Sequence, residues 1–359
     1  MAQSERQSRR RFIYECAVLI AGGMVGGLGC NSRSASRTGS SPLSAGAETP
    51  NAGFRPAYLA LHERGELKRR ADALWERMER CNLCPRECGV NRLAGERGQC
   101  RATSDLIVSS YHPHFGEEDE LVGRGGSGTI FFCGCASRCV FCINWEISQT
   151  SDCPVIHVAR LAEMMLELQQ MGCANINVVT PTHFAPHILR ALDIAAARGL
   201  RLPLVYNTCG WERLDVLAQL DGVVDIYLPD HKWGDAAAGL KYSGLRDYPE
   251  TTQRALLEMH RQVGVAKPSA DGLIRRGLMI RHLVMPNRVA NTRGVLKWIA
   301  ENLPRDTYVN LMSQYRPTYR AHEYPEINRR LTRAEYAEAL DWAQEFGLTN
   351  VREQPMPWL

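Results

Sequence analysis

Apolar and polar positions follow two alternating patterns from about residue 128 onward. Helical spacing is seen, for example, in Leu161, Ala162, Met165 and Leu168 and again from Ile188 to Ala195. A capping box of Thr332 and Glu335 predicts the start of a last helix. Between the helices, short apolar runs predict strands covered on both faces, at 128–133, 175–181, 203–208, 223–229, 277–285 and 306–313.

Six repeats of strand and helix predict parallel βα units. The pattern alone fits either a doubly wound sheet or a barrel, but no GxGxxG follows the first strand, which disfavours a dinucleotide-binding sheet. Six units are two short of a complete eightfold barrel. We therefore expect an α/β fold with a partial (β/α)6 barrel of the TIM type, whose chemistry lies on the loops after the strands.

The N-terminal region differs in composition from the rest. Residues 1–30 combine an arginine run at 9–11 with a short, glycine-rich apolar stretch, which resembles a twin-arginine export signal. Residues 31–56 are rich in Ser, Ala, Gly and Pro and are predicted to be a disordered linker. We expect an N-terminal Cys-rich subdomain at 57–120, led by a solvated helix at 57–80, and the barrel at 121–359.

The net positive charge of the chain, +4, comes entirely from its N-terminal region. The chain has 43 basic and 39 acidic side chains, of which seven and three fall in residues 1–56, leaving 36 of each sign. A folded part with no net charge argues against nucleic acid as a partner.

The loop after the first predicted strand contains Cys135, Cys139 and Cys142 at CxxxCxxC spacing. A 4Fe–4S cluster is normally held by four thiolates, so three local thiolates would leave one iron open to a small molecule. Two alternatives are a zinc knuckle, which closes with four ligands, and a structural iron–sulfur site. Cys133 would be the fourth ligand in a closed cluster.

This motif, with Phe141 before its last cysteine and a strand before its first, resembles the radical S-adenosylmethionine (SAM) superfamily. The resemblance implies a 4Fe–4S cluster that binds SAM at its open iron. It also implies reductive cleavage of SAM to a 5′-deoxyadenosyl radical that abstracts hydrogen from a substrate. In this chemistry the protein positions the reactants and the cofactors supply the radical.

Segments at later strand ends narrow the resemblance to the PflX-like group related to pyruvate formate-lyase activating enzymes. They include 180–183 (TPTH) in place of the family's Gly-Gly-Glu-Pro segment, 207–210 (NTCG), 230–232 (DHK) and 277–287 (GLMIRHLVMPN). The resemblance implies SAM contacts from Thr180, Thr182, Asn207, Asp230, Lys232 and Arg281.

Other interpretations of these residues stay open. Asp230 and Lys232 would equally form a structural ion pair. Only one of Arg281 and His282 is expected to face inward from their strand. Cys153, Cys173 and Cys209 are expected to be small buried residues.

A second cysteine group precedes the barrel. Cys81, Cys84, Cys88 and Cys100 provide four thiols, enough for zinc or for a second iron–sulfur cluster. Such a metal would either hold the subdomain together or relay electrons, and plain structural thiols are the third option.

The leading hypothesis is therefore a radical SAM enzyme, with activation of a glycyl radical protein suggested by family analogy only. Its expected partners are a low-potential electron donor, such as a flavodoxin or ferredoxin, and either a protein or a small-molecule substrate. One alternative is an electron-transfer protein without SAM chemistry, and another is an exported binding protein stapled by zinc. The export signal favours a location outside the cytoplasm, whereas SAM is supplied in the cytoplasm.

Overall fold

The computed structural model describes residues 53–356. The predicted signal segment 1–30 and almost all of the predicted linker 31–56 lie outside these residues. Among the described residues, no helix has the length and apolar character needed to cross a membrane.

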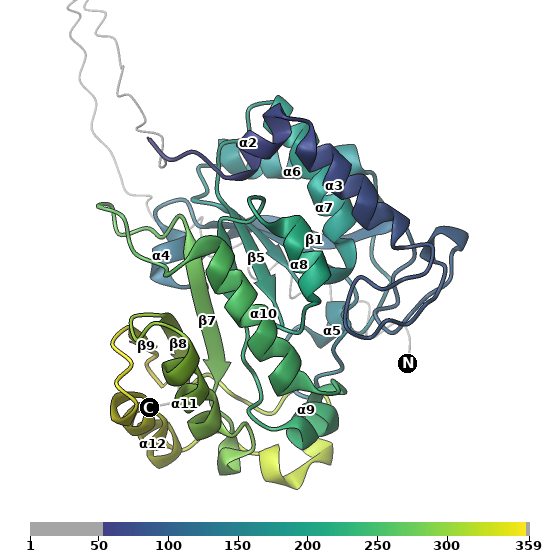
Figure 1. The fold of residues 1–359 in the computed structure, drawn as a ribbon. Helices are drawn as coiled ribbons and strands as arrows, with labels where there is room; N and C mark the ends of the chain where they lie inside the picture. The colour runs from purple at the N-terminus through teal and green to yellow at the C-terminus, as the bar shows by residue number, and fades with distance from the viewer. Residues whose placement is uncertain (1–52, 357–359) are drawn as a thin grey trace, which may run out of the picture. The chain divides into compact units, whose positions relative to one another are not determined.

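The fold is a nine-stranded mixed sheet with the strand order β3-β1-β2-β4-β5-β6-β7-β8-β9 (Figure 1). From β2 to β9 every neighbouring pair is parallel, while β1 pairs antiparallel with β2 and β3. The strands are β1 (Leu106–His114), β2 (Ser127–Phe132), β3 (Val155–Ile156), β4 (Ile176–Val179), β5 (Leu204–Thr208), β6 (Ile226–Pro229), β7 (Gly277–Leu283), β8 (Tyr308–Met312) and β9 (Val351–Glu353).

The six predicted strands are confirmed as β2, β4, β5, β6, β7 and β8. The sequence analysis missed β1, β3 and β9. Strand β1 lies within the predicted subdomain 57–120, yet it pairs with β2 of the predicted barrel, for example Tyr111 with Ile130. The predicted boundary at residues 120 and 121 therefore does not coincide with a break in the sheet.

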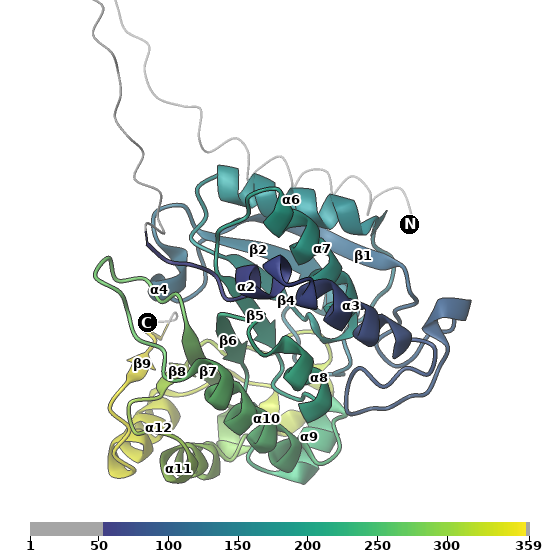
Figure 2. The ribbon, with the colours of Figure 1, turned by 45° about the horizontal axis from the view of Figure 1, so that its top comes forward.

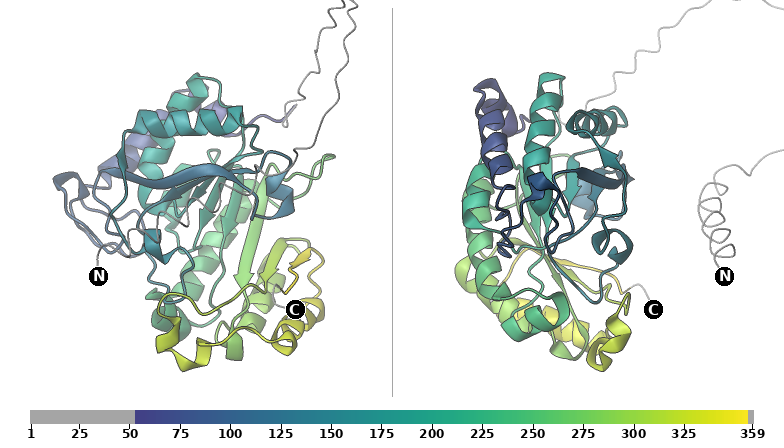
Figure 3. Two further views of the ribbon diagram at one scale, coloured as in Figure 1. Left: turned by 180° about the vertical axis from the view of Figure 1, so that it is seen from behind. Right: turned by 90° about the vertical axis from the view of Figure 1, so that its right-hand side faces the viewer.

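Helices follow the strands and cover one face of the sheet, as the side view in Figure 3 shows. They are α6 (Val158–Gln170), α7 (Ala185–Ala197), α8 (Leu214–Leu220), α9 (Ala236–Ser243), α10 (Tyr248–Val263), α11 (Thr292–Asn302) and α12 (Arg333–Glu345). The short helices α4 (Asp119–Val122) and α5 (Trp145–Ser148) lie in the connections before and after β2. The capping box predicted at Thr332 and Glu335 is confirmed at the start of α12. The predicted helical faces are confirmed by the burial of Leu161, Met165 and Leu168 in α6 and of residues 188–195 in α7, apart from Arg190, Asp193 and Ile194.

The single solvated helix predicted at 57–80 is wrong. Two helices, α2 (Tyr58–Glu63) and α3 (Glu66–Glu76), meet at Gly65, whose φ of 68° ends the first helix. Both helices bury an apolar side, as with Leu67 and Leu74, and lie beside α7 in Figure 2. The many charged residues in this segment led to the prediction of a fully solvated helix, although apolar residues recur between them at helical spacing.

The sheet has an outer face under the helices and an inner face opposite it. Alternate side chains such as Ile130, Val178 and Tyr206 belong to the large outer core. The inner face has a smaller apolar core near the strand starts, formed by Leu121, Val205, Ile226, Leu228, Ala266, Ile274, Met279 and Tyr308. Leu121 comes from residues 117–123, which we call the plug because its side chains fill this end of the inner face.

Asp225, just before β6, joins α2 to the sheet. Its carboxyl accepts hydrogen bonds from the backbone N–H groups of Ala57, at 2.9 Å, and Leu204, at 3.0 Å. Burial raises the pKa of Asp225 to about 7, although the two N–H donors and Arg276 act in the opposite direction.

We predict that Asp225 makes the protein less stable above neutral pH. Because its folded pKa exceeds its ordinary value of 3.8, its stabilising contribution is complete below about pH 4 and is lost as pH rises through about 7. Urea unfolding at pH 5 and pH 8 should show a loss of stability that is smaller in Asp225→Asn than in the wild type by an amount on the order of 2 kcal/mol. Asp341→Asn, at an exposed position on α12, is the matched control. An equal pH dependence in the wild type and Asp225→Asn would contradict the prediction.

Candidate metal centre

The loop after β2 carries Cys135, Cys139 and Cys142 at the edge of the sheet where the parallel strands end. Backbone hydrogen bonds fix this loop: Arg138 donates to the carbonyl of Ser243 at 2.7 Å, and Val140 donates to that of Tyr242 at 2.9 Å. The backbone N–H of Arg320 donates to the carbonyl of Val140 at 2.8 Å. The loop is therefore held between the end of α9 and the segment after β8.

The three thiols converge. Burial raises the pKa of Cys135, and the neighbouring thiols Cys209 and Cys139 raise it further. Burial also raises the pKa of Cys142, with Cys139 adding to the rise. Ser137 links two of these thiols, because its backbone N–H donates to Cys135 Sγ at 3.4 Å and its Oγ lies 2.9 Å from Cys139 Sγ.

Hydroxyl groups surround the sulfur atoms. Ser137 Oγ lies 2.9 Å from Cys139 Sγ, and Ser243 Oγ lies 3.1 Å from the same sulfur. Ser148 Oγ lies 3.2 Å from Cys142 Sγ. Hydroxyl donors of this kind stabilise thiolates, the form in which cysteine binds a metal.

The donor set fits an iron–sulfur cluster in its chemistry, because three thiols with hydroxyl partners converge on one loop. Within residues 53–356, however, no group of three or more His, Cys, Asp or Glu side chains is arranged so that it could hold a metal ion.

Cys209 is a fourth thiol at this centre and was not predicted to be there. It follows β5 and interacts with both Cys135 and Cys139, so the expectation of a plain buried residue missed its position. Burial, together with the carboxyl of Glu212, raises the pKa of Cys209 to about 12. Its position in the sequence could have predicted this, because Cys209 directly follows a predicted parallel strand and therefore lies at the same edge of the sheet as the motif.

The predicted residues Asp230 and Lys232 follow β6 and form an ion pair with each other. The ammonium group of Lys232 also lies near the thiols. Although burial acts to lower the pKa of Lys232, Asp230 and then Cys139 raise it, so the side chain stays charged. The ion-pair interpretation is confirmed, and the pair lies at the centre.

Thr180 and Thr182 follow β4. Thr180 has a positive φ of 59°, and its N–H donates to the carbonyl of Asn207 at 2.9 Å. Thr182 is buried and donates its hydroxyl to Glu212 at 2.6 Å. Asn207 itself lies on the inner face, two residues beyond Val205.

Glu212 is a functional candidate that the sequence analysis missed. One carboxyl oxygen accepts hydrogen bonds from Thr182 and Thr208, and the other is buried with no partner among the described residues. Burial raises the pKa of Glu212 to about 7. A carboxyl group therefore does stand beside the TPTH segment, but it comes from the next strand.

Arg281 is the inward residue of its strand, and its guanidinium group pairs with Glu117 and Glu118 of the plug. Its neighbour His282 is fully buried on the other face, where it contacts the carbonyl of His231 at 2.6 Å and the hydroxyl of Thr292 at 2.9 Å. The prediction that only one of the two faces inward is confirmed, and the outward residue, His282, is buried and not at the surface.

The two plug carboxylates also accept hydrogen bonds from asparagine side chains of the sheet. Asn310 donates to Glu118 at 2.6 Å, and Asn177 donates to Glu117 at 3.0 Å. Burial acts to raise the pKa of Glu118, but the charge of Arg281 prevails and holds this pKa at about 2. The ion pair therefore forms the floor of the inner face, between the apolar core and the cysteine loop.

The second cysteine group also converges. Burial raises the pKa of Cys84, and the neighbouring thiols Cys100 and Cys81 raise it further. Burial also raises the pKa of Cys88, and the same two thiols add to this rise. A Cβ on Gly98 would lie only 2.6 Å from the sulfur of Cys88, so this position requires glycine.

The two cysteine groups pack against each other. A Cβ on Gly134, which has a φ of 79°, would lie 2.2 Å from the carbonyl oxygen of Cys100. Arg86 donates to the carbonyl of Ala136 at 2.6 Å, and Arg138 donates to that of Gln99 at 2.5 Å. The N-terminal cysteine segment thus forms one wall of the loop that carries the first three thiols.

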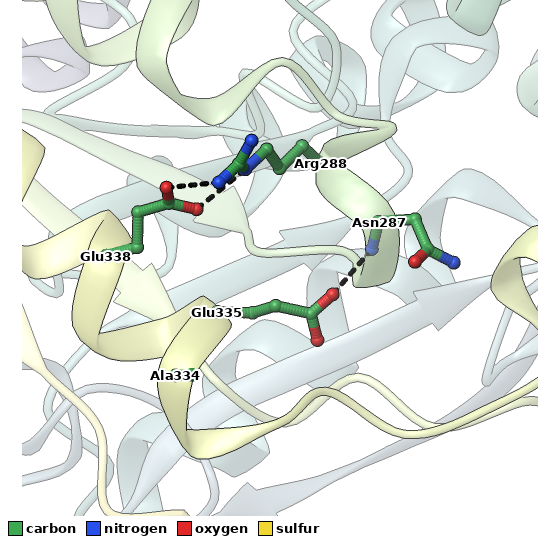
Figure 4. A pocket seen from close by; sticks show the side chains of 5 residues that line it. All are labelled: Asn287, Arg288, Ala334, Glu335 and Glu338. Atoms are coloured by element: carbon green, nitrogen blue, oxygen red, sulfur yellow. Dashed lines mark hydrogen bonds and ion pairs between the residues drawn. The ribbon is translucent and has the colours of Figure 1, made fainter.

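Two surface cavities lie away from the inner face. One, of about 500 Å³, separates α12 from the short helix η3 (Pro286–Arg288), and Figure 4 shows its charged groups paired: Arg288 with Glu338, and the N–H of Asn287 with Glu335. The other, of about 450 Å³, is lined by Arg86, Cys88, Trp211, Arg246 and four further residues, and it places an exposed thiol of the second group at its wall.

Comparison with known proteins gives one clear relative. The chain is 36% identical to the uncharacterized protein MJ0674 of Methanocaldococcus jannaschii over 279 residues, or 75% of each chain. No family model matches the chain.

Solved structures of other proteins match the chain in part. Streptococcus suis SuiB bound to its precursor peptide SuiA matches with a TM-score of 0.43 and 11% identity, over 60% of this chain and 46% of SuiB. SuiB bound to SAM matches with a TM-score of 0.41 and 12% identity, over 59% and 45%. The enzyme anSMEcpe with bound SAM also matches with a TM-score of 0.41 and 12% identity, over 61% and 58%. The chain thus spans less than two thirds of each of these proteins.

We predict that Arg281→Gln destabilises the fold by about 3–5 kcal/mol, because it leaves the buried Glu118 carboxylate without its cation. Adding both Glu117→Gln and Glu118→Gln to Arg281→Gln should recover a large part of this loss, since neither carboxylate is then left charged without its cation. Urea unfolding of the two variants measures the difference. Arg293→Gln, which breaks the exposed ion pair with Glu345, should cost less than about 1 kcal/mol. A loss of that size for Arg281→Gln would refute the importance of the buried pair.

Proposed function

The chain belongs to the family of MJ0674, and we propose from its site that it is a radical SAM iron–sulfur enzyme. The observation that carries the proposal is the convergence of Cys135, Cys139 and Cys142 on one loop at the carboxyl edge of the parallel sheet. The active sites of parallel α/β folds lie at this edge. We further propose that the sheet is the six-unit partial barrel of that superfamily, in the PflX-like group.

The three cysteines would hold a 4Fe–4S cluster with one iron open. When bound, this group supplies a low-potential electron and a coordination site for SAM, whose reductive cleavage gives a 5′-deoxyadenosyl radical. The protein's own contribution is positioning. Lys232 places a positive charge beside Cys139, which partly balances the negative charge of a thiolate-bound cluster.

Polar residues around the loop are suited to a ligand with both charged and hydrogen-bonding groups. Asp230, Asn207, Thr180 and Thr182 surround the end of the sheet, and Glu212 holds Thr182 in place at 2.6 Å. Arg281 is fully engaged by two carboxylates, so a direct contact with SAM would have to displace one of them. We therefore assign Arg281 to the floor of the site and the other five predicted residues to SAM contact.

A protein substrate fits the surface beside the loop better than a small molecule does. Ile143 and Trp145, directly after Cys142, are 62% and 39% exposed, and Trp145 stacks on Tyr319 with 5.2 Å between ring centroids. Exposed apolar groups gathered beside a catalytic loop suit a polypeptide contact. Activation of a glycyl radical protein is one reaction of this class, and it rests on family analogy.

The second cysteine group is proposed to hold zinc or a second iron–sulfur cluster. Because it packs against the first loop and exposes Cys88, a redox cluster there would lie between the surface and the first cluster. A low-potential donor such as a flavodoxin or ferredoxin would supply the electron. The export signal and the SAM requirement still point to opposite sides of the membrane.

An electron-transfer protein without SAM chemistry is the second candidate. The position of Cys209 beside Cys135 and Cys139 favours it, because this thiol would complete a four-thiolate cluster. The two candidates differ in whether the cluster responds to SAM.

The test is reconstitution of the full chain under anaerobic conditions, reduction with dithionite, and EPR spectroscopy with and without SAM. We expect SAM to change the signal of the reduced cluster and 5′-deoxyadenosine to form. Cys139→Ala should lose both the cluster and the product, whereas Cys173→Ala, a change at a buried thiol in the outer core, should keep both.

Cys209→Ser separates the two candidates. An open cluster keeps its iron and its response to SAM in this variant, whereas a closed four-thiolate cluster loses iron. A wild-type signal that ignores SAM, with no 5′-deoxyadenosine and with iron loss in Cys209→Ser, would establish the electron carrier instead.

A metal at the second group is tested by metal analysis of Gly98→Ala. The added Cβ would force the sulfur of Cys88 out of place, so we expect this variant to lose one metal equivalent, zinc or iron, relative to wild type. Leu93→Ala, at an exposed position of the same segment, should retain it. If Gly98→Ala and Cys88→Ser both keep the full metal content, the group holds only structural thiols.

A further inference from the structure

A disulfide joins the two ends of the segment that carries the candidate centre. Cys133 follows β2 and Cys153 precedes β3, and the two are bonded across a separation of 20 residues, with 6.4 Å between their Cα atoms. The ring that they close contains all three cysteines of the CxxxCxxC motif. Neither residue was expected to be cross-linked, so this corrects the sequence-based view of Cys153 as a plain buried residue.

The disulfide changes the number of thiols available in this segment. Residues 133–153 contain five cysteines, and the bond withdraws two of them, which leaves Cys135, Cys139 and Cys142. Cys133 is the thiol that the alternative closed cluster would need. It lies two residues from Cys135 in the chain, and its side chain packs in the outer core while it is bonded to Cys153.

Cys133 is also held in place through its backbone. Its N–H donates to the carbonyl of Ile107 at 3.3 Å, and its own carbonyl contacts the ring of His183 at 2.9 Å. Cys133 and His183 are both almost completely buried. Burial shields the sulfur of Cys133 from reducing agents in solution, because attack on a disulfide requires access, whereas Cys153 is only half-buried.

We propose that the Cys133–Cys153 disulfide sets the ligand number of the cluster: it keeps Cys133 out of the coordination shell, so that only three cysteines of this segment bind and one iron stays open. This inference rests on the proposed function for the meaning of the open iron. The exclusion of Cys133 as a ligand can be tested without SAM. Cys133 and Cys153 are thus positioning residues that act through the loop.

Formation of the bond is a two-electron oxidation. The thiolate of Cys153 attacks the disulfide of an oxidising thiol–disulfide exchange protein and releases one thiolate of that protein. The thiolate of Cys133 then attacks the sulfur of Cys153 in the mixed disulfide and releases the second. Two thiols are oxidised, two protons are lost, and the exchange partner leaves as a dithiol.

The first measurement maps the bond in the full chain, purified without thiol reductant. Peptide mass spectrometry under non-reducing conditions should find the 133–153 cross-link both before and after anaerobic cluster reconstitution. Alkylation of both cysteines in the unreduced protein would overturn the proposal.

The second measurement is a rescue of iron binding. All variants of this series carry Cys209→Ser, because Cys209 lies beside Cys135 and Cys139 and would itself replace a lost ligand. Cys142→Ser, with the disulfide intact, then leaves two thiols at the centre and should lose most of the iron bound there. Cys142→Ser with Cys153→Ser frees Cys133 as a replacement ligand and should hold at least threefold more iron per chain than Cys142→Ser alone. Adding Cys133→Ser to that pair should remove the gain, which shows that the iron is held by Cys133 and that the result is not caused by misfolding.

If freeing Cys133 gives no gain in iron, Cys133 cannot reach the cluster and the proposal is wrong. This outcome does not depend on SAM, so it is distinguishable from failure of the proposed function, which is measured by the SAM response of the wild type. Where the wild type does respond, Cys153→Ser alone should keep its iron and lose most of the SAM-induced change in the EPR signal. Cys133→Ser with Cys153→Ser should restore that change, and Cys173→Ser is the control for loss of an unrelated thiol.

Discussion

The parallel alignment of β2, β4, β5 and β6 is the constraint on which the candidate centre depends. Parallel strands end at the same edge, so segments that are up to about a hundred residues apart in sequence meet there. The cysteine loop follows β2, Thr182 follows β4, Cys209 and Glu212 follow β5, and Lys232 follows β6. A change in the register of one strand by a single residue would turn its inner side chains to the outer face and dismantle the site.

The interior of the sheet also has to accommodate charge. The inner face carries Arg281 in the middle of a strand, where an unpaired cation would be costly. The plug resolves this by bringing in Glu117 and Glu118, and Asn177 and Asn310 complete their hydrogen bonds. The same segment buries Leu121 in the small inner core. One short connection therefore fills the apolar end of the inner face and sets the polar floor below the cysteines.

The sequence predicted the features that local patterns encode. Apolar runs located the six central parallel strands, and the capping box located the last helix to the residue. The plug escaped prediction because its ion pair joins residues more than 160 positions apart, and no local pattern marks such a contact. Cys209 and Glu212 were missed for a related reason: their roles arise from packing beside other strand ends. The edge strands β3 and β9, of two and three residues, are too short to give a periodic signal.

The number of thiols at one place, rather than the presence of cysteines, decides what a metal centre of this kind can do. A fourth thiolate closes an iron–sulfur cluster and favours electron transfer, whereas a missing one leaves an iron for a ligand. Here the fold brings Cys209 close and withdraws Cys133 through a disulfide, so the balance between the two functions depends on only two residues. The proposed cluster needs a strong reductant, and a strong reductant would also reduce the neighbouring disulfide if it reached the sulfur atoms. Burial of Cys133 limits that access. Under the proposal the bond has to persist while an electron reaches the neighbouring sulfur atoms, and burial protects the sulfur of Cys133, although Cys153 is only half-buried.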